Sequence, residues 1–235
     1  MFLLSSKRPS FIETFHFPTL NFSVVFPNQS NVVTFDFKSS GTDEDLAWLE
    51  FHNGVAAGLQ LSPTIELVDS SWVAYNKHIT SLNSLNTHSG FLLAVGLQGH
   101  MKHLALWMVY SYLSKRHEAT TLALLLGMAV AHRGSQDDYV YRLLSIHILA
   151  LLPPDSTSLN ITETVQTAAI MGLGLLFQNT CHLRIIKLLL NEIKINISRG
   201  SFRQPESYAL AAGFALGFVA LGHFARFYKF NPLCD

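Results

Sequence analysis

The chain has 235 residues, which is enough for one large domain or two small ones. Hydrophobic residues make up 49% of it and charged residues only 14%, whereas a free-standing soluble domain carries roughly 25% charged residues. The 16 basic and 16 acidic residues give a formal net charge of zero. The sequence has no basic patch, which argues against nucleic acid as the main partner. Because charged residues are few, we expect that much of the chain is buried against something or that part of it lies in a membrane.

The N-terminal part differs from the rest and predicts a small β element. Between residues 33 and 38, apolar and polar residues alternate as in a half-buried strand, and residues 21–26 are rich in aromatic and β-branched side chains. Turn-forming residues stand between the two runs. We therefore predict a short β-hairpin and a linker in residues 1–44, followed by an α-helical repeat domain in residues 45–235.

Five stretches rich in Gly and Ala recur along the helical part. Their marker glycines lie at irregular intervals of about 30 to 50 residues, which is typical of a helical repeat array. Gly costs roughly 1 kcal/mol relative to Ala inside a helix, so its repeated use needs a compensating gain. We infer that these glycines allow neighbouring helix backbones to come close. The five repeat-packing glycines are Gly58, Gly96, Gly127, Gly174 and Gly217.

A bulkier helix is predicted after most of the Gly/Ala-rich ones, at about 103–114, 139–152 and 180–197. In the last of them, apolar residues recur three and four positions apart beside a polar stripe, which predicts an amphipathic helix that packs one face. Each Gly/Ala-rich helix and the bulkier helix after it then form a helical hairpin. Stacked hairpins of this kind form a curved solenoid or a partial toroid.

The Gly/Ala-rich helices also fit a small polytopic membrane protein, because small residues pack transmembrane helices. The candidate runs are 119–131, 165–177 and 208–224. A membrane span needs about 20 residues, and the first two runs are shorter and are followed at once by polar residues. We favour the repeat scaffold and keep the membrane bundle as an alternative.

The 11 histidines raise the question of a metal site. His100 and His103 are three residues apart, and His117, Glu118 and His132 follow. Zinc needs three or four converging ligands, usually in a compact motif, and neither His-Glu-x-x-His nor a Cys pair is present. We therefore predict no metal.

No residue pattern predicts catalysis or a cofactor. Gly172 and Gly174 lack the third glycine and the preceding strand of a dinucleotide-binding loop. Cys181 and Cys234 are far apart and match no metal-ligand spacing. We predict that the chain has no catalytic residues, no cofactor and no small-molecule substrate.

Five longer strings favour one family. They are WLEFHNGVAAGL at 48–59, SWVAYNK at 71–77, AVGLQGH at 94–100, the block at 142–154 and ESYALAAG at 206–213. In this order they resemble the repeat region of the largest subunit of the anaphase-promoting complex, or cyclosome, from about residue 46 to residue 223. Leu49 departs from the family pattern, which has Pro at that position.

This resemblance implies proteasome/cyclosome repeats, which in that family close into an α-helical toroid. It also implies a non-catalytic scaffold subunit of a cullin–RING-type ubiquitin ligase that controls mitosis, in the nucleus and cytoplasm, with the other subunits of the complex as partners. A scaffold of the proteasome base, which has the same repeats, is an alternative. Since family members are far longer, we expect a fragment, a partial gene model or a shortened version, and a closed ring would need more repeats than this sequence contains.

The long segment 60–89 is the candidate for contact with another subunit, through Trp72, Tyr75 and Lys77. Trp and Tyr are enriched among the residues that anchor interfaces. Core packing explains Trp72 at least as well. The apolar excess also predicts that the isolated chain aggregates.

Overall fold

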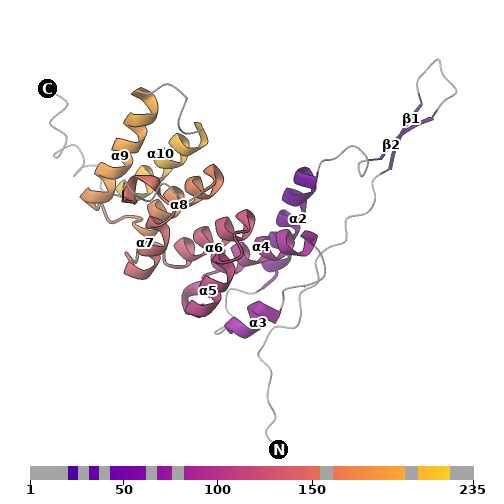
Figure 1. Ribbon diagram of the computed structural model, residues 1–235, viewed down its shortest axis with the longest axis horizontal. Helices are drawn as coiled ribbons and strands as arrows, with labels where there is room; N and C mark the ends of the chain where they lie inside the picture. The colour runs from indigo at the N-terminus through magenta and orange to yellow at the C-terminus, as the bar shows by residue number, and fades with distance from the viewer. Residues whose placement is uncertain are drawn as a thin grey trace, which may run out of the picture.

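The computed structural model describes residues 21–25, 32–36, 43–61, 68–75, 82–153, 161–198 and 206–222. This part of the chain is mainly helical, as the sequence predicts (Figure 1). The Gly/Ala-rich helices are α2 (Asp43–Gly58), α4 (Leu82–Leu97), α6 (Glu118–Ala131), α8 (Glu163–Leu176) and α10 (Glu206–Ala220).

The other described elements are four bulkier helices, two 3₁₀ turns and a pair of strands. Bulkier helices are α3 (Ser70–Tyr75), α5 (Leu106–Leu113), α7 (Asp138–Ser145) and α9 (Leu183–Ser198), and single 3₁₀ turns are η1 (His100–His103) and η2 (Leu149–Leu151). Strands β1 (Asn21–Val25) and β2 (Val32–Asp36) pair antiparallel, with Val24 opposite Val33. Both strands lie within residues 1–44.

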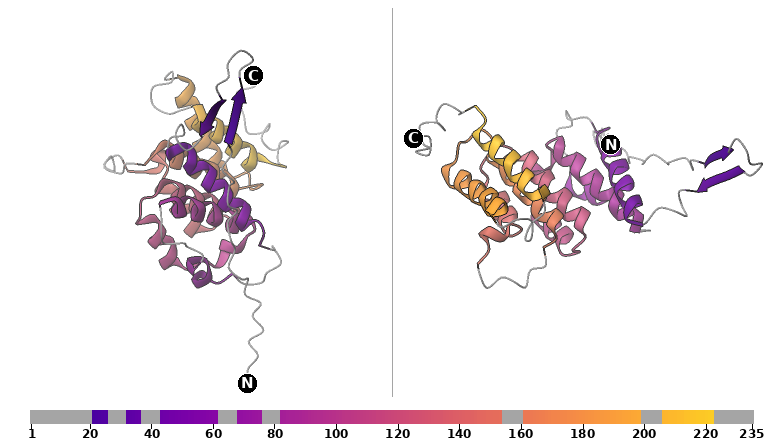
Figure 2. Two further views of the ribbon diagram at one scale, coloured as in Figure 1. Left: turned by 90° about the vertical axis from the view of Figure 1, so that its right-hand side faces the viewer. Right: turned by 90° about the horizontal axis from the view of Figure 1, so that it is seen from above.

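The Gly/Ala-rich helices pack side by side in chain order. Helix α2 lies on α4, α4 on α6, α6 on α8, and α8 on α10 (Figures 1 and 2). The bulkier helices lie against this row, with α5 on α6, α7 on α8 and α9 on α10. The core therefore runs along the row, because each Gly/Ala-rich helix packs on its neighbours and a bulkier helix also covers α6, α8 and α10.

The packing in the row depends on very close contact between helix backbones. A Cβ added at Gly96 would lie 2.2 Å from the Cα of Gly127, and one added at Gly174 would lie 2.3 Å from the Cα of Ala215. A Cβ at Gly58 would lie 2.6 Å from the Cβ of Ala94. No side chain larger than hydrogen fits at these positions without moving the neighbouring helix.

Two further glycines, not among the sequence markers, make the closest contacts between α2 and α4. A Cβ at Gly54 would lie 1.8 Å from the carbonyl oxygen of Thr87, and a Cβ at Gly90 would lie 1.8 Å from that of Phe51. The four-residue spacing of Gly54 and Gly58, which puts both on one helix face, is the sequence signal that points to Gly54.

Gly217 corrects the sequence prediction. It is exposed, and an added Cβ would meet nothing within 4 Å. The residue of α10 that contacts Gly174 is Ala215, two positions earlier. On a helix this offset turns the side chain to another face, so the glycine that marks the repeat in the sequence is not the one that packs.

At one edge of the row, the turn after a Gly/Ala-rich helix forms backbone hydrogen bonds with the next Gly/Ala-rich helix. After α6, the backbone N–H groups of Gly134 and Gln136 donate to carbonyls in the last turn of α8, and after α8 those of Asn179 and Cys181 donate to the last turn of α10. All four donors have positive φ, between 50° and 67°. The bonds are 3.0 to 3.3 Å long and reach carbonyls of the last turn, which lack a partner four residues further along the helix. The acceptors are Leu175, Leu176, Phe218 and Val219.

Two of the predicted bulkier helices are shorter than expected. Instead of one helix over 139–152, α7 ends at Ser145 and η2 follows it. The Ser145 hydroxyl donates to the Tyr141 carbonyl at 2.7 Å, and His147 Nδ1 lies 2.9 Å from the Leu143 carbonyl oxygen. These side chains bond to carbonyls of the last turn, which weakens continuation of the helix beyond Ser145. Likewise, the predicted helix at 103–114 begins only at Leu106.

None of the helices that the structure describes is long and apolar enough to cross a membrane.

Two Gly→Ala substitutions test the close contacts in the row. We expect Gly96→Ala to lower the free energy of unfolding by roughly 1–3 kcal/mol, because the new Cβ meets the Gly127 backbone. The matched control, Gly217→Ala, should raise it by about 0.5–1 kcal/mol, because Ala is the better helix former and the position is open. Chemical denaturation of the two variants measures both effects. Equal effects of the same sign would contradict this account.

Candidate interaction surface

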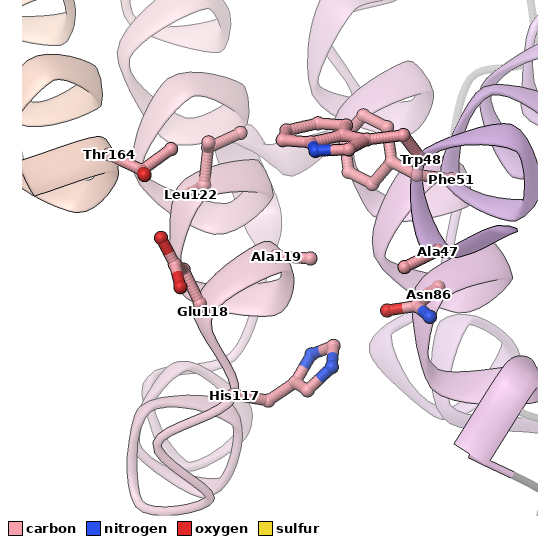
Figure 3. Close-up of a pocket in the computed structure, with 9 residues that line it drawn as sticks. All are labelled: Ala47, Trp48, Phe51, Asn86, His117, Glu118, Ala119, Leu122 and Thr164. Atoms are coloured by element: carbon pink, nitrogen blue, oxygen red, sulfur yellow. The ribbon is translucent and has the colours of Figure 1, made fainter. Parts of the chain in front are cut away.

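An open cleft lies along the edge where several Gly/Ala-rich helices begin (Figure 3). Its volume is about 390 Å³, within the roughly 300–1,000 Å³ range of ligand pockets. Helices α2, α4, α6 and α8 all contribute to it near their N-terminal ends, so the cleft exists because the row brings four separate helix starts together. The lining residues are Ala47, Trp48, Phe51, Asn86, His117, Glu118, Ala119, Leu122 and Thr164.

Trp48 forms one wall of the cleft and is held there by its own helix. Its ring packs edge-on against Phe51, with centroids 5.4 Å apart and planes at 75°, and lies 6.3 Å from the ring of His52. Phe51 is buried, with 3% of its surface exposed, whereas Trp48 is 50% exposed. The indole is therefore fixed by neighbours three and four residues along the helix and still open to a ligand.

His117 forms the floor of the cleft and caps α6. The Thr120 backbone N–H donates to its Nδ1 at 3.3 Å, and Thr120 Oγ1 lies 2.7 Å from the same nitrogen. Thr120 Oγ1 is also 2.7 Å from Ser89 Oγ of α4, so the cap is tied to the neighbouring helix. Burial lowers the pKa of His117, against the opposing effect of the Glu118 carboxylate. Only the unprotonated Nδ1 accepts a hydrogen bond, so burial favours the capping form.

A second surface lies on α5, away from the cleft residues. Trp107 and Tyr110 are 62% and 61% exposed, and Leu106 beside them is also exposed. The opposite face of α5 is buried, where Tyr112 Oη lies 2.7 Å from His88 Nε2. The helix is thus anchored on one side and presents two large aromatic side chains on the other, which is typical of a protein interface.

The predicted contact residues are only partly described by the structure. Trp72 is half-buried on α3, with its ring 5.8 Å from that of Phe91 in the core. The side chain of Tyr75 and all of Lys77 lie outside the described residues. At Trp72 the structure therefore shows core packing, and the role of the three residues as a subunit contact stays a prediction.

The histidines considered for a metal site lie in separate places. His100 and His103 are at the two ends of η1, His117 caps α6, and His132 Nδ1 lies 3.1 Å from the carbonyl oxygen of Met128. In the described part of the chain, no three His, Cys, Asp or Glu residues are grouped so as to hold a metal ion.

Comparisons with known proteins show which family the chain belongs to. Residues 1–133 match the family model described as APC1 fourth domain, and residues 138–231 match the one described as APC1 fifth domain. The chain belongs to this family. The two matched regions meet in the turn between α6 and α7, so the family models divide the chain within the row of helices.

Curated relatives are similar along nearly the whole chain. Anaphase-promoting complex subunit 1 of Homo sapiens is 43% identical over 228 residues, which is 95% of this chain and 12% of the human protein. The Schizosaccharomyces pombe subunit of the same name is 45% identical over 181 residues, or 77% of this chain and 12% of its own. A "Negative regulator of mitosis" from Emericella nidulans is 39% identical over 227 residues, or 94% and 11%. The chain spans about an eighth of the length of these relatives.

Sequence reasoning missed the cleft. Trp48 stands in one of the family strings, near the start of a helix, but the string does not show that its indole reaches the start of α6. His117 and Asn86 are separated from Trp48 by dozens of residues in the sequence. Only the packing of α2 and α4 beside α6 brings them together.

The cap at His117 predicts a pH-dependent stability. Unfolded histidine titrates near its ordinary pKa of 6.5 and the folded group titrates lower, so between these values the unfolded state binds more protons. Stability should therefore fall as the pH falls below about 6.5. His117→Asn keeps a capping side chain but does not titrate, so its stability should fall less over the same range.

Thermal unfolding of both proteins between about pH 7.5 and pH 5.5 measures this difference. His147, whose pKa burial also lowers, is present in both proteins and contributes equally. Parallel pH profiles for the wild type and His117→Asn would exclude the cap as a titrating group.

Proposed function

We propose that the chain is part of a non-catalytic scaffold subunit of an anaphase-promoting complex, a ubiquitin ligase that acts in mitosis. The observation that carries this proposal is the row of Gly/Ala-rich helices, in which each helix packs on the next and leaves the outer aromatic side chains of α5 exposed. Such a row gives a rigid, extended support and a surface for partners. The names of the relatives, anaphase-promoting complex subunit 1 and negative regulator of mitosis, agree with it.

The proposal includes a finer description of the fold. The row is a curved solenoid or partial toroid of proteasome/cyclosome repeats, preceded by a small β element, with the N-terminal segment at 1–44 and the repeat domain at 45–235. Neighbour-to-neighbour packing and the repeated turn-to-helix hydrogen bonds support it, because both are properties of solenoids.

The partners that we propose are other subunits of the complex, in the nucleus and cytoplasm, rather than nucleic acid, a small molecule or a membrane. Zero net charge and the lack of a basic patch in the sequence support this choice. Catalysis in such an assembly belongs to other subunits. The proteasome-base alternative has less support, because the relatives named above carry anaphase-promoting names.

Two surfaces are candidates for the contact between subunits. The first is the exposed pair Trp107 and Tyr110 on α5, which the structure describes fully. The second is the predicted set Trp72, Tyr75 and Lys77, in which Trp72 packs against Phe91. Substituting Trp72 would therefore damage the fold as well as any contact, so Tyr75 and Lys77 are the informative positions there.

Affinity purification of the full-length subunit from dividing cells tests the scaffold role. We expect Trp107→Ala with Tyr110→Ala to reduce recovery of other subunits, with a loss of roughly 2 kcal/mol or more in association, because exposed aromatic residues anchor interfaces. Ser111→Ala, at an exposed position on the same helix, is the matched control and should recover them normally.

A Tyr75→Ala and Lys77→Ala variant tests the second surface in parallel. Unchanged thermal unfolding of each variant shows that a loss comes from the contact and not from the fold. The scaffold proposal would be abandoned if the wild-type subunit recovered proteasome subunits, or no partner proteins at all.

A further inference from the structure

The cleft in Figure 3 places an aromatic face and a carboxylate around one space. Trp48 lies along its upper wall and Glu118, at the start of α6, along another. Both side chains are exposed. Among the lining residues that the structure describes, none is Lys or Arg. Figure 3 shows the Glu118 carboxylate beside Thr164, at the end of the cleft away from Asn86.

A further acceptor is held in a defined orientation on the opposite side. The Asn86 side-chain N–H donates to Glu50 Oε2 at 3.3 Å, which fixes the amide. Figure 3 shows the amide oxygen of Asn86 toward the cleft and its nitrogen turned away. Burial keeps the pKa of His117 low, so the imidazole on the floor adds no positive charge at neutral pH. The cleft is therefore an acceptor-rich space closed by an indole.

The ligand that fits this combination is a flat cation. A cation over an indole face is attracted by the ring, and a guanidinium also stacks on it through its planar surface. The same group donates hydrogen bonds to a carboxylate in pairs and to an amide oxygen with its remaining N–H groups. An ammonium group is smaller and more strongly hydrated, and it cannot stack.

We propose that the cleft binds an arginine side chain from an extended segment of a partner protein, stacked on Trp48 and paired with Glu118. Ala119 and Leu122 line the cleft beside the indole and offer apolar surface to the arginine stem. The natural source of the segment, a neighbouring subunit, rests on the proposed function. The arginine preference of the cleft does not.

A titration of the ¹⁵N-labelled chain with short peptides tests the site. The indole N–H resonance of Trp48 is assigned from its loss in Trp48→Phe, and the probes are acetyl-Gly-Arg-Gly-amide, the lysine analogue and the neutral citrulline analogue. We expect the arginine peptide to shift the Trp48 resonance and leave that of Trp107 in place. The lysine peptide should bind several-fold more weakly, and citrulline at least tenfold more weakly.

Substitutions at two glutamates separate a specific pair from general charge. Glu118→Gln should weaken the arginine peptide about tenfold, whereas Glu163→Gln, an exposed first-turn glutamate of α8 outside the lining, should change binding less than twofold. Equal binding of arginine and citrulline, no shift at Trp48, or equal effects of the two substitutions would each overturn the proposal.

A crosslinking measurement on the assembled complex does not depend on the solubility of the isolated chain. Benzoylphenylalanine replaces Thr164 at the rim of the cleft in the full-length subunit, and crosslinked chymotryptic peptides are sequenced. An arginine in the captured segment, with a yield that falls several-fold in Glu118→Gln, supports the proposal, and a captured segment without arginine contradicts it.

Failure of arginine binding at the cleft is distinguishable from failure of the proposed scaffold role. The co-purification experiment depends on Trp107 and Tyr110, which do not line the cleft. Peptide binding can therefore fail while co-purification succeeds, and the reverse outcome is equally recognisable.

Discussion

Backbone contact between the Gly/Ala-rich helices is the constraint on which the rest of the structure depends. At Gly96 and Gly127, and again at Gly174 and Ala215, the helices approach so closely that one methyl group does not fit between them. Glycine weakens a helix when it is considered alone. In this row the weakness is offset by close packing on the neighbouring helix, so these helices depend on one another for stability.

This close row determines what happens at both of its edges. Because α6 and α8 lie side by side in the same direction, the turn after α6 reaches carbonyls in the last turn of α8, and the same relation recurs between α8 and α10. At the other edge the helix starts come together, and their side chains enclose the cleft. One edge is thus closed by hydrogen bonds between repeats, and the other is open to a ligand.

The outer helices use the row as a support and carry different chemistry. Helix α5 buries Met108, Val109 and Tyr112 and exposes Trp107 and Tyr110. Helix α9 lies on α10, where the Tyr208 hydroxyl donates to Glu192 at 3.2 Å. The pKa of Glu192 is raised by burial, against the hydrogen bond from Tyr208. The outer helices therefore contact the row through their buried residues, while α5 also presents aromatic side chains to the surface.

The sequence by itself determined the helical class, the recurrence of Gly/Ala-rich helices and the family, because these depend on local composition, spacing and ordered strings. Tertiary structure decided which small residues make the contacts, so that Ala215 packs where Gly217 was expected and Gly54 and Gly90 pack most closely. It also decided where α7 ends and which side chains enclose the cleft. These features depend on residues distant in the sequence, whose proximity exists only once the helices have packed.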